Sequence, residues 1–368
     1  MTSTSLIPTS VARLPWKLLL LVIAIGGFGL VVLYSAAGGS LRPWALSQGV
    51  RFFVFIIAAI ALSRISLERL KQIGFPAYGI VLALLIAVEL LGVVGGGSRR
   101  WLDLGIISLQ PSELMKPVIV LTLARFYDLL PAGETRRWNA IWPAAAMIGV
   151  PFLLVLIQPD LGTAVMIMAG GLTVMFLAGL PLRLFVGGGL LIATALPIGI
   201  SFLHEYQRSR IEIFLDPERD PLGTGYHIIQ SKIAIGSGGL FGKGFLQGTQ
   251  SHLDYLPEGH TDFVFATMAE EWGLIGGLLL ILAYFLLVNW GMRVALKARS
   301  RFARLAAAGL STTIFFYFAI NLMMVMGLAP VVGIPLPLVS FGGSAMMTVM
   351  LSLGLLMAIA RTEREKSR

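Results

Sequence analysis

The sequence predicts an all-α integral membrane protein with about ten transmembrane helices, cytoplasmic termini and one large extracytoplasmic loop. Two observations carry this prediction. Of the 368 residues, 57% are hydrophobic and only 13% are charged, and the mean hydropathy is +0.85. A soluble domain carries roughly 25% charged residues. We therefore treat residues 1–368 as a single polytopic membrane domain.

A transmembrane helix needs about 20 apolar residues. Ten runs meet this requirement approximately: 18–37, 47–63, 75–95, 112–129, 139–157, 161–179, 183–202, 270–292, 304–327 and 341–360. The first resembles a signal peptide, because Arg13 and Lys17 precede it and Ser35-Ala36-Ala37 looks like a cleavage site. Its apolar run exceeds the usual signal core of about 7–15 residues, so we expect it to stay as an anchor.

The basic residues set the expected orientation. They concentrate in the short loops that face inward when the N-terminus is cytoplasmic, as the positive-inside rule requires. An even number of spans then leaves the C-terminus cytoplasmic as well. The net charge of +9 is thereby explained without a nucleic-acid partner. The absence of Cys is compatible with an oxidising outer compartment.

The outer side is expected to hold the informative polar sequence, in loops 96–111 and 202–261. All four His residues lie in the second loop, but no metal-ligand spacing appears there. The apolar segment that follows, 262–296, is too long for one span: its 34 helical steps give about 51 Å against a hydrocarbon core of roughly 30 Å. We predict a break near 270–273, with a short helix over 262–269 beside a wet, outward-facing cavity.

Asp262 leads this hydrophobic segment. A carboxylate in that position is costly to bury and commonly serves chemistry. A helix N-terminus would favour its ionised form, as a base requires. The alternative is a simple N-cap aspartate.

Two further outer motifs place charges at the start of inward-running helices. Glu113 and Lys116 are three residues apart on one helix face, which predicts either a structural ion pair or a lysine that meets an anionic substrate. Asp160 is either a helix cap or part of a cavity wall. The motifs around these residues, Gln110-Pro111-Ser112-Glu113 and Gln158-Pro159-Asp160, look like a faint repeat.

Two outer basic clusters, Arg99-Arg100 beside Trp101 and Arg208-Ser209-Arg210, are either solvated or bind phosphate through the forked guanidinium. The glycine-rich run 236–244 is not a Walker motif, because Ser237 stands where a glycine is needed. Residues 226–235 are expected to form an interfacial helix.

The run 327–345 contains three prolines and several glycines, which predicts a fixed, non-helical outer loop between two spans. Together with Asn321, it resembles the signature of the SEDS family (shape, elongation, division and sporulation proteins). Arg100-Trp101, Gln110-Pro111-Ser112-Glu113 with Lys116, Gln158-Pro159-Asp160-Leu161-Gly162 and His260-Thr261-Asp262-Phe263 extend the match. The loop around 214–232 and the run 332–337 are similar to the elongation branch rather than the division branch.

The resemblance implies a peptidoglycan glycosyltransferase of the bacterial cytoplasmic membrane that polymerises lipid II into glycan strands at the outer face. Asp262 corresponds to the essential catalytic carboxylate. Phe341 departs from the pattern, because Tyr is common there. The residues expected to bind substrate are Arg100, Trp101, Glu113, Lys116, Asp160, Arg210, Lys232, His260 and Ser340. The resemblance also implies a class B penicillin-binding protein transpeptidase and other elongation-complex membrane proteins as partners.

The expected reaction joins an acceptor hydroxyl to the anomeric carbon of a donor, with Asp262 as base and undecaprenyl diphosphate released. Arg100, Arg210 and Lys116 are expected to stabilise the leaving diphosphate, with a divalent cation (Mg or Mn) as an optional helper. The alternative function is a flippase or transporter of the lipid-linked precursor. A transporter predicts polar residues along a path to the inner face, whereas the strong polar motifs lie on the outer side.

Overall fold

The computed structural model describes residues 14–366, apart from 96–97, 104, 106–107, 132, 201–207, 209–211, 215, 217–219, 221–222, 254 and 257. The long helices are α2 (Trp16–Ala36), α3 (Trp44–Leu62), α4 (Leu67–Leu91), α5 (Pro111–Leu129), α6 (Trp138–Ile157), α7 (Leu161–Leu177), α8 (Leu182–Ile200), α12 (Val264–Lys297), α13 (Arg301–Val325) and α14 (Gly343–Lys366). Each coincides with one of the ten predicted runs. The all-helical membrane fold is therefore confirmed.

Seven of these helices are long and apolar enough to cross a membrane: α2, α3, α4, α6, α12, α13 and α14. Helix α7 and the first part of α8 are apolar but shorter, and α5 carries several polar side chains. The chain is thus a multi-pass membrane protein. A total of ten crossings, and the assignment of the two faces, stay predictions.

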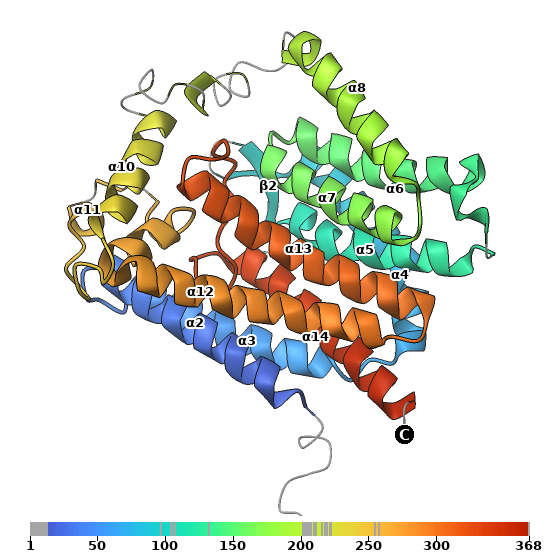
Figure 1. Cartoon of the computed structure of the whole chain (residues 1–368), viewed down its shortest axis with the longest axis horizontal. Coiled ribbons are helices and arrows are strands. Elements are labelled where there is room, and N and C mark those ends of the chain that lie inside the picture. The colour runs from blue at the N-terminus through green and yellow to red at the C-terminus, as the bar shows by residue number, and fades with distance from the viewer. Residues whose placement is uncertain are drawn as a thin grey trace, which may run out of the picture.

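Helix α13 is the centre of the bundle, where it contacts α5, α7, α12 and α14 (Figure 1). Within α13 and α14, 67% and 78% of the most apolar window is buried, against 22% in α3 and in α4. The peripheral helices turn exposed Leu, Ile and Phe side chains outward, as lipid-facing helices do. The central helices bury the polar residues that occur within their apolar runs.

Helix α12 is broken at Gly273, which has φ 65° and ψ −164°. This confirms the predicted break near 270–273. The glycine-rich run 236–244 supplies hydrogen-bond partners to the backbone at the break. Lys243 N donates to Glu270 O (2.9 Å), and Leu274 N donates to Gly239 O (2.9 Å). A Cβ at Gly273 would lie 2.3 Å from Gly242 N, so the close approach requires glycine there. The glycine-rich run 236–244, which is not a Walker motif, therefore packs against the break in α12 and binds its backbone.

Two of the segments predicted to lie on the outer side form elements of their own. In the predicted loop 96–111 and the three residues before it, three short strands pair antiparallel in the order β1 (Val93–Gly95), β2 (Ser98–Asp103) and β3 (Ser108–Leu109). These strands were not predicted from the sequence. The predicted interfacial helix appears as α10 (Thr224–Ser237), which contacts α12 and α13, with the short α11 (Thr249–His252) beside it (Figure 1).

Candidate active site

Asp262 lies in the turn that precedes α12 and is partly exposed. Its N-cap interpretation is wrong, because the helix begins at Val264 and its N-cap is Phe263, with no side-chain cap. A Cβ built on Gly333 would lie 3.4 Å from Asp262 Oδ2, so this carboxylate sits against the backbone of the loop between α13 and α14. Gly333 has φ +69°, a conformation that favours glycine.

Asn321 fixes the position of this turn from the bundle core. Its side chain is fully buried, and Nδ2 donates to the carbonyl of Asp262 (2.8 Å) and to that of Ile334 (2.7 Å). One amide on α13 thus joins the Asp262 turn to the loop that carries Gly333. The main chain of the acid is held by a rigid element, as a preorganised catalytic group requires.

Ser340 ties the same two segments together a second time. Its hydroxyl donates to Thr261 O (2.6 Å) and accepts from Leu336 N (2.8 Å). Its own carbonyl accepts from Gln48 Nε2 on α3 (2.6 Å). Ser340 is 2% exposed. Although it was predicted to bind substrate, its hydroxyl here joins the loop to the Asp262 turn inside the protein.

His260 is part of an aromatic stack at the edge of the turn. Its ring lies parallel to that of Trp44, with centroids 4.0 Å apart, and 6.2 Å from the ring of Phe341. Burial lowers the pKa of His260, and the nearby Glu258 carboxylate opposes this only in part. A neutral imidazole is therefore favoured near pH 7.

A cavity of about 630 Å³ opens next to this stack and is lined by α3, by β2 and β3, and by the start of α14. Trp101 lines it, as does Arg51, whose Cζ lies 4.9 Å from the centre of the Phe341 ring. Trp101 was predicted from the sequence as a substrate-binding residue, whereas Arg51 was not. An arginine inside an apolar span was the available signal for it.

Glu113 and Lys116 form the predicted ion pair, with Nζ and Oε1 2.6 Å apart. Tyr317 completes the cluster, because its hydroxyl accepts from Lys116 Nζ (2.7 Å) and donates to Glu113 Oε2. Lys116 is 1% exposed and Glu113 5%. The sequence analysis missed Tyr317, which lies one helical turn before Asn321 on α13.

Of the two alternatives for Asp160, the helix cap is present in the structure: its Oδ1 accepts from Thr163 N (3.2 Å) at the start of α7. Its Oδ2 accepts from Gln110 Nε2 (3.0 Å) at the start of α5. A Cβ at Gly162 would lie 2.6 Å from Val332 O, so the loop that carries Gly333 also packs tightly on this helix end. The motifs that begin at Gln110 and at Gln158 therefore meet beside the loop that carries Gly333.

The three remaining predicted residues have different outcomes. Arg100 donates from Nε to Gln158 O (3.1 Å) and from a terminal nitrogen to Pro159 O, so it anchors the sheet to the end of α6. Lys232 packs its Cε against Gly327, at the start of the loop. Arg210 lies outside the described residues.

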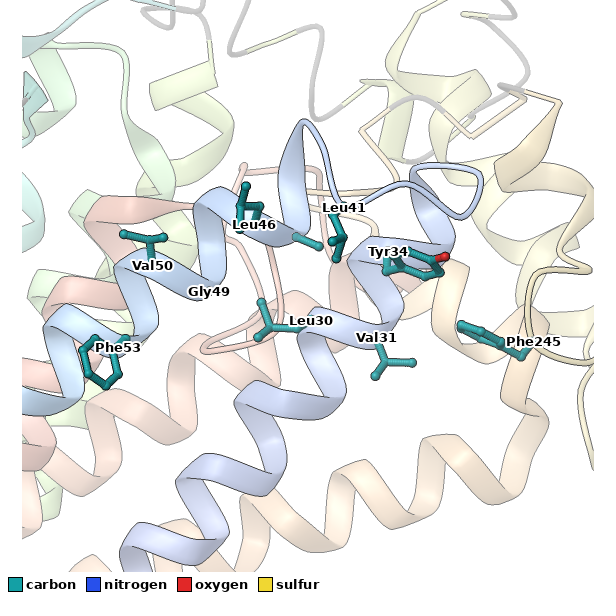
Figure 2. A pocket seen from close by; sticks show the side chains of 10 residues that line it. Leu30, Val31, Tyr34, Leu41, Leu46, Gly49, Val50, Phe53 and Phe245 are labelled. Carbon is teal, nitrogen blue, oxygen red and sulfur yellow. The ribbon is translucent and has the colours of Figure 1, made fainter.

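A second, apolar cavity of about 580 Å³ lies between α2 and α3 near the same end of the bundle (Figure 2). Leu30, Leu46, Val50 and Phe53 line it, and the rings of Tyr34 and Phe245 close one end. Such a surface suits a hydrocarbon chain. No group of three His, Asp or Glu side chains that would hold a metal occurs among the residues that the structure describes.

Comparison with known proteins extends these observations to the whole chain. A model of the FtsW/RodA/SpoVE family, described as a cell cycle protein, matches residues 15–365. The peptidoglycan glycosyltransferase MrdB of Escherichia coli (strain K12) is 44% identical over 93% of this chain and 92% of MrdB. Stage V sporulation protein E of Bacillus subtilis (strain 168) is 38% identical over 77% of each chain.

Solved structures agree. A chain of a peptidoglycan synthase complex, described as coordinating polymerization and crosslinking, superposes with a TM-score of 0.83 at 34% identity, covering 95% of this chain and 98% of that one. The rod shape determining protein RodA of Thermus thermophilus gives a TM-score of 0.72 at 31% identity, covering 95% and 97%. The resemblance found in the sequence is confirmed: the chain belongs to the FtsW/RodA/SpoVE family.

Proposed function

We propose that this protein is a peptidoglycan glycosyltransferase that polymerises lipid II at the outer face of the bacterial cytoplasmic membrane. The observation that carries the proposal is the setting of Asp262. This partly exposed carboxylate stands on a turn whose backbone is fastened to α13 by Asn321 and to the neighbouring loop by Ser340. Relatives in the same family are named peptidoglycan glycosyltransferases.

Asp262 acts as the base in this mechanism. It accepts the proton of the acceptor sugar hydroxyl as that oxygen attacks the anomeric carbon of the donor, and undecaprenyl diphosphate leaves. An α-linked donor that gives a β-linked glycan requires a single displacement with inversion. One carboxylate is enough for this step, because the diphosphate is a good leaving group and needs charge stabilisation more than a proton.

The cations around the site divide into two kinds. Lys116 is buried and shared between Glu113 and Tyr317, so its charge is largely compensated within the protein. Arg51 lines the cavity beside Trp101, with its guanidinium carbon 4.9 Å from the centre of the Phe341 ring. We therefore assign diphosphate stabilisation first to Arg51, with Arg100 in support and Lys116 in a structural role.

A divalent cation stays part of the proposal as an optional helper. The described residues bring no three ligands together, so such an ion would take most of its oxygens from the diphosphate. When bound, it would neutralise charge on the leaving group.

The two cavities suit the two ends of the substrate. The cavity at Arg51 and Trp101 has the polar and aromatic lining that a sugar diphosphate needs, whereas the cavity of Figure 2 is lined by apolar side chains and suits the polyprenyl tail. We also propose a class B penicillin-binding protein as partner, with other elongation-complex membrane proteins around it. The structural relative from a synthase complex supports such an assembly.

The direct test is polymerisation of labelled lipid II by the purified protein, with and without the partner transpeptidase and a chelator. Asp262→Ala is expected to abolish glycan formation. The matched control is Glu258→Ala, which removes an exposed acid from the same turn and is expected to leave polymerisation intact. Full activity in Asp262→Ala would refute the assignment of the base.

A further inference from the structure

A basic cavity of about 780 Å³ lies at the opposite end of α12 from Asp262. It forms where α2 begins and where α12 and α14 end, and these three helices run side by side in Figure 1. The positive-inside rule assigns this end of the bundle to the cytoplasm. The cavity is therefore separate from the site proposed above.

The lining of this cavity has a large excess of positive charge. Five basic side chains and one carboxylate line it: Lys17, Arg293, Lys297, Arg299, Arg364 and Glu363. One oxygen of this carboxylate is bound to the backbone, because Glu363 Oε2 accepts from Arg299 N (2.9 Å). Lys17, Arg293 and Lys297 are exposed, and they come from two different helices. Such a set suits an anion with several oxygen atoms.

The surroundings of the cavity indicate where this anion comes from. Trp16 and Trp290 line the same space, and Trp side chains commonly lie at the level of the lipid headgroups. One turn deeper, Leu20 on α2 is 62% exposed and Leu286 on α12 is 45% exposed. A ligand held here by the cations would thus continue along a lipid-facing apolar surface. A free phosphate ion would use only the charged part.

We propose that this cavity binds the headgroup of an anionic phospholipid from the inner leaflet. The phosphodiester lies among Lys17, Lys297 and Arg293, and the acyl chains follow the exposed apolar side chains of α2 and α12. Basic pockets between transmembrane helices on the cytoplasmic side commonly bind such headgroups. The bound lipid would add to the direct contacts that α12 makes with α2 and with α14.

The test measures lipids retained by the purified protein in native mass spectrometry, after titration with phosphatidylglycerol or phosphatidylcholine. The wild-type protein is expected to prefer phosphatidylglycerol, and Lys17→Gln with Lys297→Gln is expected to weaken its binding about tenfold or more. The control, Arg69→Gln with Arg183→Gln, removes two exposed basic residues that do not line the cavity, and should bind as the wild-type protein does.

Equal weakening in both double variants, or no preference for phosphatidylglycerol in the wild-type protein, would overturn the proposal. A third arm adds inorganic phosphate. Displacement of the lipid at equimolar phosphate would mean that a free anion site is present instead. If the Lys17/Lys297 variant does not fold, single Lys17→Gln is used with brominated phosphatidylglycerol. The brominated lipid should quench the part of the fluorescence that Trp290→Phe removes, and less so in Lys17→Gln. Quenching that Lys17→Gln leaves unchanged would contradict the proposal.

Discussion

Asp262 and Glu113 are two acids at the same end of the bundle, and they differ in burial and in hydrogen-bond partners. Glu113 is buried, and its two carboxylate oxygens are occupied by Lys116 and Tyr317. Asp262 is partly exposed, and Asn321 binds its carbonyl. The first acid holds helices together. The second has its main chain fixed at the edge of a loop, which is the arrangement that proton transfer to a substrate needs.

The largest stability effect is expected from breaking the buried pair. Lys116→Met leaves Glu113 without its cation in a low-dielectric interior and should cost about 3–5 kcal/mol. The thermal midpoint in detergent measures this loss. Adding Glu113→Gln to the same chain should recover a large part of it. A Lys116→Met protein that melts with the wild-type protein would contradict the structural role of the pair.

A smaller loss is expected at Asn321. Asn321→Ala leaves the buried carbonyls of Asp262 and Ile334 without their shared donor, which should cost about 1–3 kcal/mol. Because the Asp262 turn is then less fixed, the rate of lipid II polymerisation should fall by more than the loss of folded protein explains. The two effects are separated by assaying activity well below the melting transition. An unchanged rate there would show that the amide does not position the acid.

Gly333→Ala should cost about 1–2 kcal/mol, because φ +69° is unfavourable for a residue with a Cβ. The added methyl would also contact Asp262 Oδ2. The control is Gly27→Ala in α2, where a Cβ meets nothing within 4 Å. That change should be neutral or slightly stabilising in a helix. If both variants melt alike, the backbone of the loop is not constrained as described.

The smallest effect concerns pH. The pKa of His260 is lowered by burial in the folded protein, so the unfolded chain binds a proton more readily. The contribution of His260 to the free energy of unfolding is fully present above the ordinary His pKa of about 6.5, and it is lost as the pH drops below that value. His260→Gln should flatten this part of the pH–stability curve. An equally steep fall in the variant would assign the effect to other groups.

The sequence predicted those features that depend on local patterns. Apolar runs located the long helices, and the excess length of 262–296 located the break at Gly273. Spacing along one helix predicted the Glu113–Lys116 pair, and position before a helix predicted the Asp160 cap.

Contacts between distant segments were not predictable in this way. Tyr317 lies 204 residues from Glu113, and no spacing rule relates them. The bond from Gln48 to the Ser340 carbonyl spans 292 residues. Strand β2 carries Arg100 to the end of α6, where its Nε and one terminal nitrogen donate to the carbonyls of Gln158 and Pro159. These contacts depend on how the helices pack.

The two acids differ in what each carboxylate does, and one measurement tests the role of Asp262. It is the rate of lipid II polymerisation by Asp262→Asn, at a temperature where its melting curve overlays that of the wild-type protein. We expect Asp262→Asn to fold and its rate to fall at least about 100-fold, because the shape is kept and the base is lost. A folded Asp262→Asn protein that polymerises at the wild-type rate would refute the role of Asp262 as base.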